Sequence, residues 1–241
     1  MSFKIDKDLA LLYGIMLGDG CLSLFGKNEK VIAVTGSSRD DLQFFNKVIH
    51  PILEKLRKKK TNLKFRRRYN AIEFNFRDKN LFDFLHSLGF PIGRKVNRIF
   101  IPEIFYKKKL VNYIIQGFFA TDGSLVLTKN PNKLYPRLES HACCKNLLIE
   151  IHKYLISLGM SGGFYKCPKQ KKHPLSFNET HPKFRFQFNG KRNLILFNDL
   201  IGFVNPSYKN KFDYFIKYDR DYDWRRGDLN SRPRPHESRV L

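Results

Sequence analysis

The order of apolar and polar positions along the chain occurs twice. Each half begins with an apolar run of helical spacing and continues into an alternating stretch that predicts two strands. A second helical pattern, over about residues 41–56 and 145–158, then leads to a basic hairpin. The last strand of each hairpin alternates phenylalanine with polar residues, and a short helix with a Gly-Phe step closes each half. The pattern therefore predicts an α+β fold with two antiparallel sheets and a pseudo-twofold repeat of the order helix, two strands, helix, two strands, helix.

The spacing of landmark residues supports a duplication. Residues 12–20 read LYGIMLGDG and residues 115–123 read IQGFFATDG. From the aspartate of each segment to the first phenylalanine of the strand pair there are 55 residues (74 − 19) and 64 residues (186 − 122). From that phenylalanine to the closing glycine there are 15 and 16, and from glycine to a following lysine 6 and 7. The extra residues of the second half fall in the Pro- and Lys-rich stretch 167–182.

These landmarks divide the chain into three parts. Residues 1–106 form the first repeat and residues 107–224 the second, joined by a basic linker at about residues 106–109. From Arg225 onward, arginine, proline and glycine replace the apolar pattern, so we expect residues 225–241 to be a basic disordered tail.

The repeated segment predicts where the two halves meet. Helical spacing places Gly14 and Gly18 on one face, and Gly117 and Thr121 on the equivalent face, and small residues four apart allow two helices to pack closely. Asp19 and Asp122 then lie near each other, each at a helix C-terminus before a glycine that we expect to adopt a left-handed conformation. Two carboxylates at two negative helix ends require a proton or a cation, and a hard divalent cation such as Mg²⁺ suits carboxylate and carbonyl oxygens.

The overall charge indicates the partner. The chain has 45 Lys and Arg against 22 Asp and Glu, a formal net charge of +23. Such an excess attracts a polyanion through counterion release, so we expect nucleic acid to bind. There is no apolar run long enough to span a membrane and no N-terminal signal pattern, and the four cysteines lack metal or disulfide spacing. We therefore expect an intracellular protein, cytoplasmic or nucleoid-associated, that does not bind membranes.

The two aspartate segments resemble the two name-giving motifs of the single-chain LAGLIDADG homing endonucleases, and the resemblance extends to about residue 222. It implies a monomer in which two sheets form a saddle over double-stranded DNA, with the motif helices packed at the centre. It also implies a cut in each strand of a long site, the reaction that promotes intron homing.

The resemblance further implies site residues by position. Asp19 and Asp122 would bind Mg²⁺, which Mn²⁺ could replace, together with the backbone carbonyls of Gly18 and Thr121. Lys95 and Lys209 follow the Gly-Phe steps and would lie near the scissile phosphates, although Lys211 competes with Lys209. Some relatives have Gln or Lys after the second strand of a repeat; this chain has Gly-Ser-Ser at residues 36–38 and Cys-Cys-Lys at residues 143–145.

The hairpin strands supply the residues expected to contact DNA. Alternation directs the phenylalanines to the core and the intervening polar side chains to the opposite face, where Arg can pair with guanine and Asn or Gln with adenine. The expected base readers are Glu73, Asn75, Arg77, Arg185, Gln187 and Asn189. Expected phosphate contacts include Lys64, Arg66, Arg68 and Lys166, with Arg67, Lys169, Lys171 and Lys172.

Two other functions fit the same scaffold. An RNA maturase that assists intron splicing would have a similar positive surface, so intron RNA is a second candidate partner. A DNA-binding regulator would keep the fold without catalysis. Neither needs both aspartates, which favours the nuclease. The start at Met1 and the end at Leu241 make a protein-splicing origin the less favoured expectation.

Overall fold

The computed structural model describes residues 3–26, 28–130, 133–168 and 182–227, without the side chains of residue 130 and residues 220–227. The first half starts with α1 (Lys7–Asp19), β1 (Gly20–Phe25) and β2 (Glu29–Ser37). A continuous helical segment follows, made of α2 (Leu42–Phe44), a π-helical turn (Phe45–Ile49) and α3 (His50–Arg57). The half ends with β3 (Leu63–Arg66), a 3₁₀ turn (Arg67–Tyr69), β4 (Ala71–Arg77) and α4 (Lys79–Ser87).

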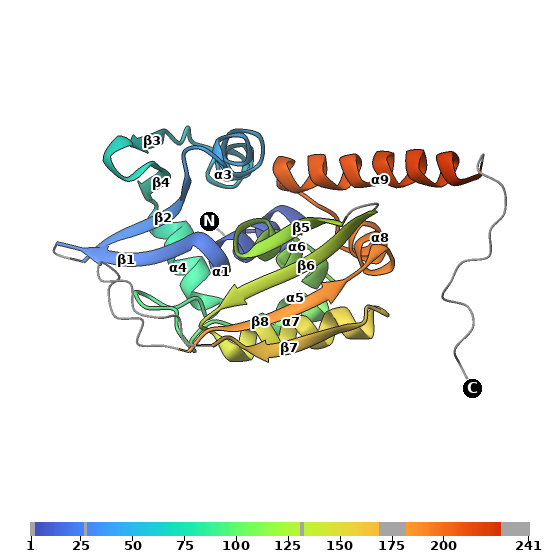
Figure 1. Cartoon of the computed structure of the whole chain (residues 1–241). Coiled ribbons are helices and arrows are strands. Elements are labelled where there is room, and N and C mark those ends of the chain that lie inside the picture. The colour runs from blue at the N-terminus through green and yellow to red at the C-terminus, as the bar shows by residue number, and fades with distance from the viewer. Residues whose placement is uncertain (1–2, 27, 131–132, 169–181, 228–241) are drawn as a thin grey trace.

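The second half has the same order. It contains α6 (Val111–Asp122), β5 (Gly123–Asn130), β6 (Lys133–Ala142), α7 (Lys145–Ser157), β7 (Gly162–Lys166), β8 (Phe184–Asn189) and α8 (Lys191–Leu200). Two helices lie outside the repeat: α5 (Glu103–Lys107), which occupies part of the expected basic linker, and α9 (Pro206–Gly227). Figure 1 shows the two halves side by side, with α9 extending away from the body. The predicted duplicated α+β fold is confirmed.

Both sheets are antiparallel and have the same strand order, β1-β2-β4-β3 and β5-β6-β8-β7. The phenylalanine strands β4 and β8 occupy equivalent inner positions, and their registers correspond: Val34 faces Phe74 as Ser140 faces Phe186. Phe74, Phe186 and Phe188 are at most 1% exposed, so the alternation correctly assigned one face of each strand to the core. The opposite faces of β4 and β8 therefore carry the polar side chains.

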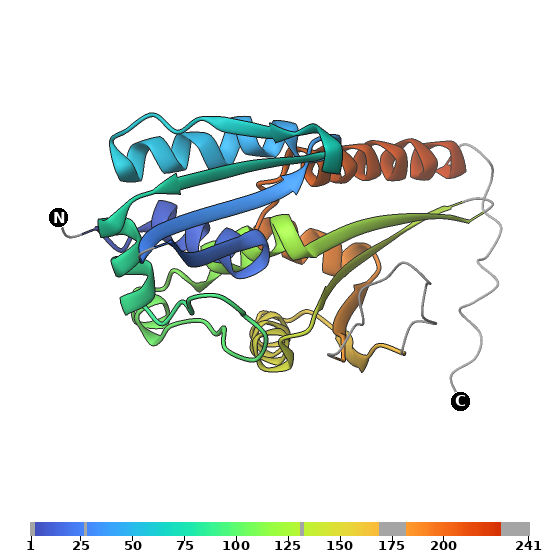
Figure 2. The same cartoon turned by 90° about the vertical axis from the view of Figure 1, so that its left-hand side faces the viewer.

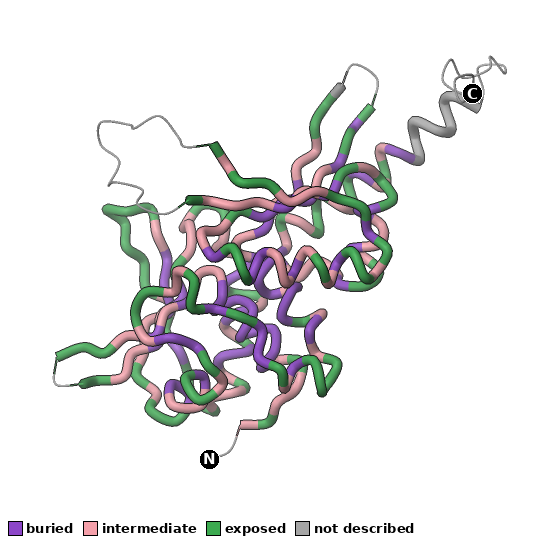
Figure 3. The backbone as a smooth tube through the Cα atoms, turned by 90° about the horizontal axis from the view of Figure 1, so that it is seen from below, coloured by how far each residue is buried: buried purple, intermediate pink, exposed green. Residues whose placement is uncertain are grey.

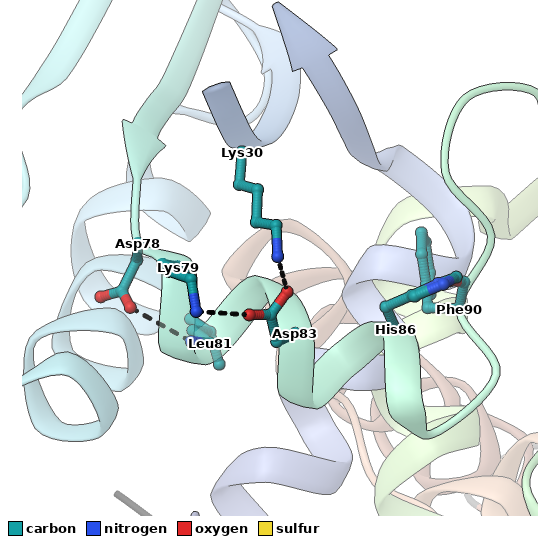
Figure 4. Close-up of polar contacts among 7 residues, drawn as sticks. All are labelled: Lys30, Asp78, Lys79, Leu81, Asp83, His86 and Phe90. Carbon is teal, nitrogen blue, oxygen red and sulfur yellow. Dashed lines mark hydrogen bonds and ion pairs between the residues drawn. The ribbon is translucent and has the colours of Figure 1, made fainter. Parts of the chain in front are cut away.

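Polar contacts attach α4 to the helix side of the first sheet (Figure 4). Asp78 accepts a hydrogen bond from the backbone N–H of Leu81 at 3.1 Å and so caps the start of α4. Lys30 of β2 forms an ion pair with Asp83 of α4, which fixes the direction of the Lys30 side chain toward the helices. Figure 3 shows that the buried residues gather at the centre of the molecule, where the helices meet the sheets.

The two halves meet at α1 and α6, which pack backbone to backbone. A Cβ on Gly14 would lie 2.0 Å from the carbonyl oxygen of Ile114, and a Cβ on Gly117 would lie 2.2 Å from that of Leu11. Ile114 lies three residues before Gly117, as Leu11 lies three residues before Gly14. The two contacts are therefore equivalent under the pseudo-twofold relation. The small residues therefore allow the close helix packing that their spacing predicted.

Three sequence-based expectations need correction. Gly20 and Gly123 have φ of −87° and −88°, which is extended and not left-handed, because a strand begins at each glycine. Glycine is required at these positions because there is no room for a side chain. A Cβ on Gly20 would lie 2.5 Å from Cα of Met16, and one on Gly123 would lie 2.3 Å from the Phe119 carbonyl oxygen. The helix α9 continues to Gly227, past the tail boundary expected at Arg225, and residues 228–241 lie outside the described part.

The helix α9 also joins the two halves. It begins beside α2 of the first half and contacts β5 and β6 of the second half. Figure 2 shows α9 continuing along the same side of the molecule as the helical segment of residues 42–57. Within the described residues, no helix has both the length and the apolar character needed to cross a membrane.

Candidate active site between the two repeats

Asp19 and Asp122 are brought together at the C-terminal ends of α1 and α6. A Cβ on Gly18 would lie 2.0 Å from Oγ1 of Thr121 and 3.4 Å from the carboxyl carbon of Asp122, so the end of α1 packs directly on the end of α6. The backbone carbonyl of Asp122 accepts a hydrogen bond of 2.8 Å from the buried Ser140 hydroxyl. The two predicted aspartates therefore share one site at the junction of the two sheets.

The electrostatics of this site oppose two negative charges. Burial, and then the charge of Asp122, raise the pKa of Asp19 to about 7. Burial also raises the pKa of Asp122 to about 6. The nearby Lys95 counteracts both shifts, but it does not cancel them. At neutral pH the pair therefore binds a proton or a cation more readily than ordinary surface carboxylates do.

Lys95 lies at the end of α1. Its ammonium group donates to the carbonyls of Met16 at 3.2 Å and Leu17 at 3.1 Å, and it also contacts the carbonyl of Gly18. Burial lowers the pKa of Lys95, while Asp122 and Asp19 act in the opposite direction. The positive charge thus stabilises the negative end of α1 and faces both carboxylates.

The second half provides different groups at the equivalent place. The side-chain amide of Asn205 donates to the carbonyl of Ala120 at 3.0 Å, and the hydroxyl of Tyr208 donates to that of Gly123 at 2.5 Å. Burial and the charges of Asp41, Asp19 and Asp122 raise the pKa of Tyr208 to about 12. Within the described part of the chain, the Lys209 side chain forms no hydrogen bond or ion pair with α6, and Lys211 donates to the carbonyl of Leu125 at 3.1 Å. The structure therefore pairs Lys95 with α1 but not Lys209 with α6.

Asp41, Asn205 and Tyr208 are site residues that the sequence did not identify. Asp41 accepts from the backbone N–H of Ser37 at 2.8 Å, and its charge acts on both Asp19 and Tyr208. In the sequence, Asp41 looks like a helix-start residue and Asn205 like the residue before a helix-start proline. Only the packing of α2 and α9 beside the ends of α1 and α6 shows their second role.

The residues of this site fit a divalent cation in part. Asp19 and Asp122 offer half-buried carboxylate oxygens, and burial raises the pKa of both, so a bound cation would offset the cost of their charges. The Gly18 carbonyl already accepts a bond from Lys95, so its expected role as a ligand requires Lys95 to move. Among the described residues, no group of three or more His, Cys, Asp and Glu side chains is arranged to hold a metal ion.

The polar face of the first sheet carries paired charges. Arg66 contacts Glu73 at 2.6 Å, and Glu73 is only 6% exposed, so this expected base reader is instead a buried ion-pair partner. Arg77 contacts Glu29 at 2.6 Å. Asn75 lies between these pairs on β4, and Lys64 lies opposite Glu73 on β3. Arg68 is exposed in the turn between β3 and β4, where it lies over the ring of Tyr69.

The polar face of the second sheet contains Arg185, Gln187 and Asn189, as expected. Arg185 lies over the ring of Tyr165, and the amide of Gln187 donates to Asn189 at 2.9 Å. Lys166 is opposite Phe184 in the register and is therefore on the helix side of β7. Its expected contact with DNA phosphate stays a prediction. Lys145 is exposed with its ammonium group over the Phe184 ring, and Lys169, Lys171 and Lys172 lie outside the described residues.

At the level of sequence, the chain resembles a segment of one longer protein. No family model matches the chain. A probable translation initiation factor IF-2 of Methanocaldococcus jannaschii is 30% identical over 210 residues, which are 83% of this chain. The chain spans only 16% of the length of that factor, so the similarity concerns one segment of it.

Comparison with solved structures identifies the fold. The chain matches a variant of the homing endonuclease I-DmoI with a TM-score of 0.53 at 16% identity, over 81% of this chain and 95% of that one. It matches the LAGLIDADG homing endonuclease I-LtrWI bound to target DNA with a TM-score of 0.55 at 9% identity, over 90% and 91%. The LAGLIDADG meganuclease I-AabMI bound to uncleaved DNA gives 0.53 at 12% identity, over 93% of each chain.

Proposed function

We propose that this chain, which has the fold of the LAGLIDADG homing endonucleases, is a site-specific DNA endonuclease that breaks both strands of a long site and so promotes intron homing. The observation that carries the proposal is the pair of half-buried aspartates at the junction of two sheets with polar faces. A binding protein gains nothing from two carboxylates whose pKa values are raised to about 7 and about 6, because their charges oppose folding. A metal-dependent nuclease needs them.

Asp19 and Asp122 would hold the metal, with Mg²⁺ as the expected ion and Mn²⁺ as a substitute. Such an ion supplies an activated water and stabilises charge on the phosphate. Structures of I-DmoI with DNA and Mn and with DNA and Ca support divalent-ion dependence here. Lys95 adds a fixed positive charge beside the carboxylates, and Tyr208 and Asn205 hold the end of α6 in place.

The two polar sheet faces would bind the major groove on either side of the site that is cut. A major groove about 12 Å wide admits β-strands, whose polar side chains reach base edges. The formal charge of +23 supplies the sequence-independent attraction to the phosphates. Because one chain contains both halves of the saddle, it would act as a monomer inside the cell.

The proposal is tested with duplexes selected from a randomised library. We expect the full chain to cut both strands with Mg²⁺ or Mn²⁺, and to leave them intact in EDTA. Asp19→Asn and Asp122→Asn should each reduce cleavage by at least 10²-fold while binding in Ca²⁺ changes less than threefold. Asp213→Asn, an exposed substitution on α9, is the matched control and should cut normally. Normal cleavage by both active-site variants would refute the proposed site.

An RNA maturase on this scaffold makes the opposite prediction. It would bind intron RNA in preference to duplex DNA, and Asp19→Asn would leave its activity unchanged. The segment shared with an initiation factor does not support a role in translation, because 16% of that factor does not represent its activity.

A further inference from the structure

One of the two inner strands of the first sheet, β2, presents a row of weakly polar side chains on the face that the proposed function assigns to DNA. Lys30 reaches α4 on the helix side (Figure 4), and Ile32 and Val34 are at most 1% exposed in the core. Alternation therefore directs Val31, Ala33 and Thr35 to the opposite face. Thr35 is exposed, and Val31 and Ala33 are half-buried. These three residues are called the β2 row below.

Polar side chains flank the β2 row on the neighbouring strands. Asn75 of β4 is directly opposite Ala33 in the register, and Ser23 of β1 is directly opposite Val31. A hollow at this end of the sheet is lined by Phe76 and by six residues of the same face as the row: Ser23, Phe25, Val31, Lys64, Asn75 and Arg77. The β2 row is therefore accessible to a ligand at Val31, and the side-chain amide of Asn75 lies beside Ala33 at its centre.

The arginines of this face are paired with carboxylates. Arg66 is bound to the buried Glu73, and Arg77 to Glu29. Separating Arg66 from Glu73 would leave a buried carboxylate without its partner, which is unfavourable. An arginine that reads guanine must turn toward the base edge, so the pair with the buried Glu73 disfavours guanine recognition by Arg66. The exposed pair of Arg77 with Glu29 opposes it only weakly. Lys64 lies on β3 at the edge of this face, and the amide of Asn75 and the β2 row form its centre.

An A·T base pair has the matching chemistry. In the major groove adenine offers an acceptor and a donor that an asparagine amide can bind together, and thymine offers a 5-methyl group that suits an apolar contact. Neighbouring strands are about 4.8 Å apart, so Asn75 and Ala33 can contact the two bases of one pair. We propose that the first sheet selects A·T pairs, with Asn75 on adenine and the β2 row on thymine methyl groups.

The second sheet is an internal comparison because its register is equivalent. Arg77, Asn75 and Glu73 correspond to Asn189, Gln187 and Arg185 through the paired phenylalanines. By the same register, Val31, Ala33 and Thr35 correspond to Arg137, Glu139 and His141. Arg137 and Glu139 lie 3.0 Å apart as an ion pair. The three positions that are carbon-rich in the first sheet are therefore charged or polar in the second, and only one half-site should depend on thymine methyl groups.

The inference rests on the proposed DNA-binding function and is tested by binding, without cleavage. Duplexes selected by the full chain from a randomised library in Ca²⁺ are remade with deoxyuridine in place of thymine, in one half-site at a time. Deoxyuridine keeps the hydrogen-bonding edge and removes only the methyl group. We expect each contacted methyl to contribute about three- to fourfold in Kd in the half read by the first sheet, and less than 1.5-fold in the other half.

Four variants identify the half-site and keep the test independent of folding failure. Asn75→Ala should lose the preference for A·T at one base pair, and Gln187→Ala, its counterpart in the second sheet, should change a position in the other half. Ala33→Glu copies the residue of the second sheet and should remove the thymine preference; Ala33→Ser is the milder second variant and should weaken it.

The outcomes separate the two proposals. Selection of G·C at the pair that responds to Asn75→Ala, or equal tolerance of deoxyuridine in both halves, would overturn the A·T inference while the endonuclease proposal stands. Failure to select or bind any duplex would overturn the DNA-binding function and this inference with it.

Discussion

Replacing Asp19 with Asn should stabilise the metal-free protein at pH 8 while it abolishes cleavage. The folded state raises the pKa of Asp19 to about 7, whereas an unfolded aspartate titrates near 3.9. The folded state therefore binds the proton more tightly, so ionisation opposes folding: stability is highest below about pH 4, falls between about pH 4 and 7, and levels off above. A shift of about three units corresponds to roughly 4 kcal/mol at most.

Part of this free-energy cost is the repulsion between the charges of Asp19 and Asp122. Neutralising Asp19 removes that repulsion for both carboxylates. We therefore expect Asp19→Asn to raise the free energy of unfolding by about 2–4 kcal/mol at pH 8 in EDTA. For a chain of this length that is a rise in Tm of roughly 5–10 °C. The gap should narrow steadily as the pH falls from 7 toward 4, because the wild-type carboxyl becomes protonated.

Thermal unfolding in EDTA at several pH values measures this difference. Asp213→Asn removes an exposed carboxylate of α9 and should change Tm by less than about 1 °C. Added Mg²⁺ should stabilise the wild type more than the variant, because ligand binding to the folded state raises its stability. An unchanged or lower Tm for Asp19→Asn at pH 8, or a gap that does not depend on pH, would show that the two carboxylates are not forced together.

Three further outcomes follow from the geometry. Lys95→Met should slow cleavage on the order of 10²-fold with little change in Kd measured in Ca²⁺, whereas Lys209→Met should cut within twofold of wild type; the reverse order would contradict the role given to Lys95. Gly117→Ala should lower the free energy of unfolding in urea by at least about 2 kcal/mol, because its Cβ would lie 2.2 Å from the Leu11 carbonyl oxygen. The control Gly93→Ala should lower it by about 1 kcal/mol, because only the φ of +78° opposes the change. Arg68→Gln should reduce the slope of log Kd against log salt concentration by about 1, and an unchanged slope would remove Arg68 from the phosphate contacts.

The fold could be predicted because its signals are local and occur twice. Gly14 and Gly117 indicated close helix packing, and the alternation around Phe74 and Phe186 indicated which face of each strand is core. The same periodicity placed the aspartates at two helix ends. Each of these inferences depends on residues within one element, and the duplication supplied a second, independent example of each.

The surroundings of the aspartates could not be predicted because they come from distant segments. Lys95 was found by its spacing after a Gly-Phe step, but the same rule selected Lys209, whereas Asn205 and Tyr208 hold the end of α6. The turn from Asn205 into α9, which begins at Pro206, determines which side chains face the site. For Lys166, the partner in β8 decides its face, and the long connection between β7 and β8 concealed that register in the sequence.

The reciprocal glycine contacts between α1 and α6 have a consequence for how this protein can change. Each glycine faces main-chain atoms of the other half, and no substitution in that half can remove these atoms. Gly14 and Gly117 therefore cannot be replaced by larger residues, whatever the other half contains. The outer faces of the sheets carry no such mutual restriction. Under the proposed function, recognition of a new sequence can therefore be acquired in one half at a time. A hybrid that joins one half to that of a relative should keep the pair of aspartates in place if the small residues between α1 and α6 are retained.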